Sequence, residues 1–446
     1  MSGISAISSA AARVASSLDP VASPAPIANL GPYPSPLRRR SVALITLRPM
    51  ETEPTALLTD PMAVFGFLAG IVALIFWVSE LPRFKKLFEL VPPVIYVYFI
   101  PMLTTTAGIT PAESPLYNWT VPYLLLFALL VLMISIDVRS IIKLGPTALF
   151  MVLAGTVGII IGGPISLLLF KGFLPPDAWT GFAALSGSWI GGTANMVAIA
   201  ESVGTSADAM GPVIVVDTVV GYGWMGVLIA FSGYQARFDR RTNANTAVIE
   251  ETNKRLANLD DDRRPTTLRD AIVIIGMGMA GAVAANELGQ LLPSLGDPTI
   301  ISNTTWAILI VVTGGLILSF TPLRDLEKVG ASGFGYTALY LLLAGIGAQA
   351  DLRAVLDAPV YLLAGAVWIA IHVGVLLIAA HLVKAPLFFV ATGSMANIGG
   401  AASAPVVAGV YHPAMAPVGL LMAVAGYIMG IYGAIACAWL LGIVGG

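Results

Sequence analysis

Long apolar segments, separated by short polar ones and by one long polar stretch at 233–269, fill residues 56–446. Ten of these segments are continuous, at about 62–79, 90–108, 120–136, 146–170, 209–232, 270–292, 304–320, 333–349, 359–382 and 414–443. Two more, at about 180–202 and 386–410, are interrupted by glycine and polar residues. Because a helix crosses the hydrocarbon core with about 20 apolar residues, the pattern predicts an all-α polytopic membrane protein with about ten continuous helices and two broken segments.

The two interruptions share one composition of paired glycines, small residues, a hydroxyl and an Asn. They are Gly187-Ser188-Trp189-Ile190-Gly191-Gly192-Thr193-Ala194-Asn195 and Gly393-Ser394-Met395-Ala396-Asn397-Ile398-Gly399-Gly400-Ala401. In lipid, a broken helix leaves backbone groups that protein, water or a ligand must satisfy. Interrupted segments at corresponding places in two halves of a chain point to the binding site of a secondary transporter. The alternative is close helix packing, with Ser and Asn bonded to neighbouring helices.

The chain repeats itself at long range. Gly191-Gly192 recurs 208 residues later as Gly399-Gly400, and the stretch that ends at Asp137 recurs at a similar offset in the stretch that ends at Asp351. A unit of this length is too long for a solenoid and suits a duplicated transporter half. We therefore expect four parts: a disordered or targeting segment at 1–55, a first transmembrane repeat at 56–232, a polar cytoplasmic linker at 233–269 and a second transmembrane repeat at 270–446.

Basic residues in the short loops predict how the halves are oriented. Lys and Arg place the first loop, the loop after 120–136 and the linker 233–269 in the cytoplasm. Three apolar segments lie between the last two, so one of them fails to cross simply, and the broken 180–202 is the natural choice. The Asp137 loop then faces the cytoplasm and the Asp351 loop the opposite side. This predicts two inverted repeats, each with a discontinuous helix that crosses near mid-membrane.

Composition supports the membrane assignment and narrows the chemistry. The 446 residues are 57% hydrophobic and 11% charged, whereas soluble proteins carry about 25% charged residues. The single cysteine, Cys437, excludes a disulfide framework and a thiolate metal site. Neither a phosphate-binding loop nor a zinc-protease motif nor a catalytic triad occurs, so we expect no enzyme, no catalytic residue, no metal centre, no cofactor apart from bound Na⁺, and no nucleic-acid partner.

The first 49 residues differ from the rest of the chain. They are rich in Ser, Ala and Pro, contain one acidic residue, Asp19, and resemble an organellar transit peptide. The alternative is an upstream start codon, with Met50 as the true beginning. We accordingly expect a bacterial inner membrane protein, with a plastid or other organelle membrane as the alternative.

Asp217 lies in the middle of a spanning segment, within Val213-Ile214-Val215-Val216-Asp217-Thr218-Val219-Val220. A charge at the bilayer centre costs at least ~2.5–3.5 kcal/mol, and none of the apolar runs offers a Lys or Arg to pair with it. We predict a cation or proton site formed by Asp217 with Asn195 and Asn397. The alternative is a protonated or hydrogen-bonded Asp that holds two helices together.

Around the interruptions we expect the solute to bind. Half-helix N-termini present free N–H groups to an anionic group, while freed carbonyls and side-chain oxygens suit a cation. The predicted binding residues are Ser188, Gly191, Gly192, Thr193, Asn195, Ser394, Asn397, Gly399, Gly400 and Ser403. Two other residues have a weaker claim: Glu201 is either a gate or an interfacial acid, and His372 is better explained as a hydrogen-bonded contact between helices.

The strings from Gly191 to Ala198 and from Ala391 to Pro405 resemble an uncharacterised membrane family of bacteria and plants, whose plant members are labelled keratin-associated. The resemblance covers about residues 55–446. That family is similar in turn to the cation/proton antiporter and anion transporter superfamily, which includes bile acid:sodium symporters, sodium:glutamate symporters and sodium/proton antiporters.

The resemblance implies two inverted repeats, a core domain with two crossed discontinuous helices, and a panel domain that often forms homodimers. It also implies an elevator-like movement of core against panel. In the antiporters a carboxylate follows the first broken helix, which is the place of Asp217. The chain departs from them at Val216, where they carry a polar or acidic residue, and in 414–443, which lacks a Lys.

These departures favour a symporter. We expect a Na⁺- or H⁺-coupled secondary transporter of a small anionic organic solute that works by alternating access in the lipid bilayer. The alternatives are a cation/proton antiporter without an organic substrate, and a structural or regulatory membrane protein without transport.

Overall fold

A computed structural model describes residues 56–445 except 92, 257–262, 297–300 and 351–357. The predictions for residues 1–55 and for the Asp351 loop lie outside the described residues. Within them the regular secondary structure is helical, apart from one isolated β-bridge between Leu295 and Ile301. The expected all-α polytopic architecture is confirmed. Seven of the described helices are long and apolar enough to cross a membrane, or eight if the bent pair Asn303–Leu318 and Pro322–Val329 counts as one span.

Each predicted apolar segment is helical. The main helices are α2 (Pro61–Ser79), α4 (Pro93–Thr106), α5 (Pro115–Thr120), η1 (Val121–Leu125), α6 (Leu126–Ile134), α7 (Val138–Ile142), α8 (Pro146–Phe170), α9 (Ala178–Val203), α10 (Ala207–Phe231), α11 (Gln235–Thr242), α12 (Ala247–Leu256), α13 (Leu268–Gln290), α14 (Asn303–Leu318), η4 (Pro322–Val329), α15 (Ala331–Gly347), α16 (Ala358–Val383), α17 (Leu387–Ile398), α18 (Gly400–Tyr411) and α19 (Ala416–Gly445). The helix α8 begins and ends at the predicted residues. Its start is set by Pro146, because proline is favoured in the first turn of a helix.

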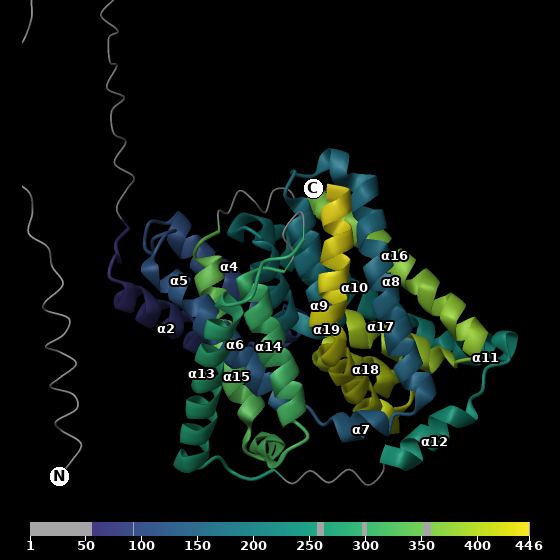
Figure 1. Ribbon diagram of the computed structural model, residues 1–446. Coiled ribbons are helices and arrows are strands. Elements are labelled where there is room, and N and C mark those ends of the chain that lie inside the picture. Colours follow the sequence, from purple (N-terminus) through teal and green to yellow (C-terminus); the bar gives the residue numbers. More distant parts are fainter. Residues whose placement is uncertain (1–55, 92, 257–262, 297–300, 351–357, 446) are drawn as a thin grey trace, which may run out of the picture. The chain divides into compact units, whose positions relative to one another are not determined.

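The helices form two groups (Figure 1). The first, here called the crossing group, contains α8, α9, α10 and α16 to α19, with α19 packed against α9 and α8. The second, the flanking group, contains α2, α4, α6, α13, α14 and α15. Both groups draw helices from both halves of the sequence, so the spatial division does not follow the order of the chain. Few contacts join the groups, which leaves room for cavities between them.

The helices α6 and α15 occupy corresponding places in the two halves of the sequence and pack antiparallel. Leu132, near the end of α6, lies against Gly335, near the start of α15. An inverted repeat requires this relation between equivalent helices. The inverted repeat as a whole stays a prediction.

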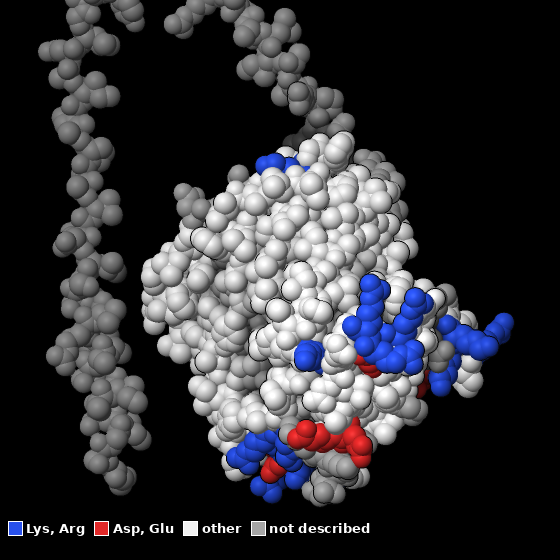
Figure 2. Space-filling model, turned by 90° about the vertical axis from the view of Figure 1, so that its right-hand side faces the viewer, with Lys and Arg blue, Asp and Glu red and all other residues white. Residues whose placement is uncertain are grey.

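The surface shows a broad uncharged zone. In Figure 2, most Lys and Arg side chains of this face gather towards one end, with an uncharged expanse between them and a small basic patch near the other end. Large apolar side chains on the described helices are exposed, among them Leu153, Leu168 and Ile378. Apolar surface of this extent fits contact with lipid tails better than contact with water.

Candidate functional site

The helix α9 is broken at Gly192. This residue has φ 79° and ψ 179° inside an otherwise helical segment, a backbone region that only glycine adopts without large strain. The break divides α9 into a first half that ends at Gly191 and a second half that begins at Thr193. The N–H groups of the first turn of the second half therefore have no carbonyl partners within their own half-helix.

A second break separates α17 from α18. Gly399 ends α17 and Gly400, with φ 60°, begins α18. As at Gly192, a positive φ favours glycine. Both interruptions that the sequence predicted are therefore real breaks in the backbone, and each lies at the second residue of its Gly-Gly pair.

One side chain, Tyr427 of α19, contacts both breaks. A Cβ added to Gly192 would stand 3.1 Å from Cε1 of Tyr427, and one added to Gly400 would stand 3.3 Å from its hydroxyl oxygen. The hydroxyl also accepts a hydrogen bond from the backbone N–H of Ala401, at 3.2 Å. Because Tyr427 reaches both, the two breaks lie close together in space, although some 200 residues separate them in the sequence.

A cavity of about 710 Å³, here called the central cavity, lies beside the two breaks, between the crossing and the flanking groups. Of the predicted binding residues, eight line it: Ser188, Gly191, Gly192, Thr193, Asn195, Gly399, Gly400 and Ser403. Asp217 lines it as well. The structure therefore brings the predicted carboxylate and most of the two breaks to one space, of the size that small-molecule sites commonly have.

Asp217 is held by the first half of α9. Its Oδ2 accepts a hydrogen bond from Ser188 Oγ at 2.9 Å. The indole N–H of Trp189 lies near the same carboxylate, although it meets no acceptor at hydrogen-bonding geometry. No Lys or Arg of the described chain forms an ion pair with Asp217. A carboxylate in this setting has room for a cation or a proton as its remaining partner.

Asn195 supplies a free oxygen next to the first break. Its Nδ2 donates to the carbonyl of Gly191 at 2.8 Å, which fixes the side chain across the break. Its Oδ1 is buried and has no hydrogen-bond partner among the residues that the structure describes. A buried acceptor without a partner costs about 1–3 kcal/mol. This oxygen therefore points to a missing partner, either a cation or a donor on a bound molecule.

The structure turns the two remaining predicted residues away from the cavity. Asn397 faces α8, where its oxygen accepts from Thr156 Oγ1 at 3.0 Å and its nitrogen donates to the carbonyl of Val152 at 3.2 Å. The same nitrogen donates to the carbonyl of Gly393 in its own helix at 3.0 Å. Ser394 is also buried and absent from the lining. The expected role of Asn397 as a cation ligand and of Ser394 as a solute ligand therefore has to be revised to one of positioning α17.

Ser394 belongs to a buried hydrogen-bond chain that ends at His372. Nδ1 of His372 lies 2.9 Å from the carbonyl of Gly155, so this nitrogen carries the proton and donates. Nε2 then accepts from Ser394 Oγ at 2.9 Å, and Ser394 Oγ accepts from Trp224 Nε1 at 2.9 Å. This chain ties α8, α10 and α16 to α17, and His372 is a contact between helices.

Charged residues gather where the cavity meets the α6–α7 turn. Asp137, Arg263 and Glu327 line this end of it. Asp137 forms an ion pair of 2.8 Å with Arg324 of η4. Partial burial raises the pKa of Asp137, but hydrogen bonds from Ser140 and the charge of Arg324 outweigh it and lower the pKa overall. This carboxylate therefore stays ionised and already has a cation of its own.

Sequence reasoning missed the tyrosines of the cavity. Tyr222, Tyr336, Tyr340 and Tyr427 all line it, and the Tyr336 and Tyr427 side chains lie near each other. These side chains place hydroxyl donors around the two breaks. Their one signal in the sequence is weak: Tyr222, Tyr336 and Tyr427 directly follow glycines in otherwise apolar segments.

Replacement of Tyr427 tests how the breaks are joined. We expect Tyr427→Phe to lower the free energy of unfolding by about 1 kcal/mol, because the Ala401 N–H loses its acceptor while the ring contact with both glycines stays. Thermal unfolding of the purified protein in detergent measures this loss. The control is Tyr234→Phe, since Tyr234 is 57% exposed and does not line the cavity. Equal melting temperatures for wild type and Tyr427→Phe would contradict the role of the hydroxyl.

Comparison with known proteins agrees with a membrane assignment. The model of a family described as "Protein of unknown function (DUF819)" matches residues 66–443. An "Uncharacterized membrane protein YjcL" of Bacillus subtilis (strain 168) is 25% identical over 385 residues, which cover 84% of this chain and 95% of that protein.

Proposed function

The chain belongs to the DUF819 family, and from its site we propose that this integral, multi-pass membrane protein is a cation-coupled secondary transporter of a small anionic organic solute. One observation carries the proposal. Two helices are broken at Gly192 and Gly400, and the breaks meet at Tyr427 beside a cavity that also contains Asp217. Backbone that is freed in this way persists at membrane depth only where it is buried in protein or lines a cavity that a ligand or water can enter.

The breaks suit an anionic solute. The second half of α9 and the helix α18 both begin at the cavity, at Thr193 and Gly400. Helix N-termini carry partial positive charge and free N–H donors. The tyrosine hydroxyls add further donors, and Arg263 is the one Lys or Arg among the lining residues that the structure describes. A carboxylate or similar group is the chemistry that such donors recognise.

Asp217 and Asn195 suit the coupling cation. Asp217 lines the cavity, Asn195 has an unpaired buried oxygen beside the first break, and hard cations prefer oxygen ligands. With a cation bound, the charge of Asp217 is compensated, so an anionic solute can enter the same cavity without repulsion. Coupling follows if the fully loaded site changes its access more readily than the half-loaded site.

The finer assignment rests on resemblance. The two helix groups fit a core and a panel as in the cation/proton antiporter and anion transporter superfamily, and we propose that the crossing group moves against the flanking group. By the same resemblance we propose a bacterial inner membrane location and a homodimer formed through the flanking group. An antiporter, or a membrane protein without transport, is then an outcome of the test.

Uptake into proteoliposomes tests this function. We expect a small organic anion to accumulate at least ~10-fold over a no-gradient control when a Na⁺ or H⁺ gradient is imposed, because coupling transfers the free energy of the gradient to the solute. A thermal-shift screen of ions with small carboxylates, amino acids and peptides identifies the solute to be used. Cation flux without solute uptake would support an antiporter. No ligand-dependent shift and no flux would contradict transport altogether.

A further inference from the structure

A second polar cavity lies between the two helix groups, away from the first. It has a volume of about 520 Å³ and surrounds the ends of α9, α13 and α15 and the starts of α10 and α14. Its lining residues are Tyr117, Asn118, Pro122, Leu126, Glu201, Thr205, Ser206, Ala207, Asn286, Gln290, Thr304, Ala307, Ile346 and Gln349. We call it the Glu201 cavity. No residue lines both this cavity and the central cavity, so the two cavities are separate.

Three helices touch both cavities at the same interval. The residues that line the central cavity are Asn195 on α9, Leu132 on α6 and Tyr340 on α15. The residues of the same helices that line the Glu201 cavity are Glu201, Leu126 and Ile346. The interval is six residues each time, which corresponds to about 9 Å along a helix axis. The two cavities therefore approach each other from opposite ends of the boundary between the helix groups.

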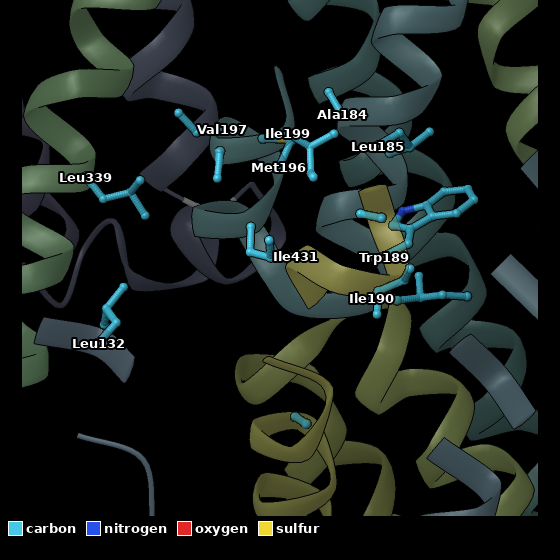
Figure 3. Close-up of a cluster of buried hydrophobic side chains, with 14 of the residues drawn as sticks. Leu132, Ala184, Leu185, Trp189, Ile190, Met196, Val197, Ile199, Leu339 and Ile431 are labelled. Carbon is cyan, nitrogen blue, oxygen red and sulfur yellow. The ribbon is translucent and has the colours of Figure 1, made fainter. Parts of the chain in front are cut away.

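The layer between the cavities is apolar and closed. Val197 on α9, Leu129 on α6 and Leu342 on α15 fall within the three intervals, and all are 0% exposed. Figure 3 shows Val197 and, from the flanking group, Leu339 at this boundary. A septum only about 9 Å thick means that a modest displacement of one helix group would open one cavity to the other.

The Glu201 cavity has the chemistry of a cation site. Its carboxylate, in the last turn of α9, makes no hydrogen bond or ion pair with the described chain. Amide and hydroxyl side chains line the same cavity, from Asn118, Asn286, Thr304 and Gln349. The amide nitrogen of Gln349 already donates to the carbonyl of Gly345 at 3.0 Å, which leaves its oxygen for a ligand. No Lys or Arg occurs among the described lining residues.

We propose that the Glu201 cavity is a second ligand site, which takes a small monovalent cation, either an alkali ion or a primary ammonium group. It opens on the face of the membrane opposite the linker, because it gathers the helix ends that lie away from Asp137 and Arg263. The proposal rests on the proposed function in one respect: in a transporter this cavity is the entrance that serves the second access state. Its charge preference and its sidedness hold without transport.

Cysteine labelling tests the charge preference. The native Cys437 is 0% exposed, so the wild type is the unlabelled reference. We introduce Thr304→Cys and compare a trimethylammonium with a sulfonate methanethiosulfonate reagent, each normalised to its rate with free cysteine. We expect the cationic reagent to react ~10-fold faster, and added Na⁺ at constant ionic strength to slow it.

Two further variants test whether Glu201 causes the preference for the cationic reagent. Glu201→Gln should bring the ratio of the two rates close to one, whereas Glu287→Gln, at an exposed acid on the same end of α13, should leave it unchanged. A ratio near one in Thr304→Cys itself, or a ratio that Glu201→Gln does not move, overturns the cation site.

Sidedness is measured in sealed vesicles. Thr304→Cys should react only from the side opposite the linker, and Ala402→Cys, in the central cavity, only from the linker side. Reaction of Thr304→Cys from the linker side would contradict a closed layer between the two cavities. If the wild type shows no solute uptake but Thr304→Cys still prefers the cationic reagent, the result counts against the proposed function and not against the cation site.

Discussion

Asp217→Asn should abolish cation-dependent stabilisation of the protein and cation-driven uptake. The change keeps the size of the side chain and an acceptor for Ser188 Oγ, but it removes the negative charge from the cavity. Two unit charges ~4 Å apart attract by ~4 kcal/mol at an effective dielectric constant of 20. We therefore expect cation affinity to fall by at least ~100-fold, measured as the cation concentration that gives half of the maximal thermal shift.

Asp137→Asn is the matched control for this change. Asp137 lines the same cavity, but it already has Arg324 as its cation at 2.8 Å. Its removal should leave the ion response within ~3-fold of wild type, because an exposed ion pair of this kind contributes at most ~1 kcal/mol. If Asp217→Asn kept the full ion response, the central cation site would be wrong whatever Asp137→Asn did.

The sequence predicted the helices and the breaks because lipid imposes strict rules on both. An apolar run of spanning length has few alternatives to a helix, so even the ends of α8 could be placed. Paired glycines among polar residues contradict such a run, and Gly192 and Gly400 do break it. Asp217 was identified by the same reasoning, since a carboxylate in an apolar segment requires a polar surrounding.

The direction in which individual side chains point could not be predicted. These helices are apolar on all sides, so no polar face shows which side chains point to the cavity. Asn195 and Asn397 are an instructive pair. Asn195 follows its break and lines the cavity, whereas Asn397 precedes its break and bonds to α8. Tyr427 was missed for the same reason, because its role depends on how α19 is rotated against both breaks, one of which lies in the other half of the sequence.

The breaks also explain why the crossing group needs α19. Gly430 of α19 approaches the backbone of Gly191 so closely that a Cβ at Gly191 would stand 2.7 Å from its Cα. Such contact allows Tyr427 to reach Gly192 and Gly400 from one helix. The two breaks are therefore supported by protein on one side and open to the cavity on the other, which is the arrangement that a site for a ligand requires.

Gly192→Ala should both destabilise the protein and impair uptake. Alanine at φ 79° and ψ 179° is strained by roughly 1–3 kcal/mol, and its Cβ would press on Tyr427 at 3.1 Å. We expect the melting temperature to fall by several degrees. We also expect uptake to drop by at least ~10-fold, because relief of the strain moves the N–H groups of Thr193 and its neighbours away from the cavity.

Gly204→Ala separates backbone strain from the site itself. Gly204 ends α9 with φ 68° and ψ 40°, and a Cβ there would meet nothing within 4 Å. Strain at this position is about 1–2 kcal/mol, so stability should fall while uptake, measured per folded protein, stays within ~2-fold of wild type. Equal loss of uptake in both variants would mean that Gly192 serves folding alone. A normal uptake rate in Gly192→Ala would mean that the solute does not bind at the break.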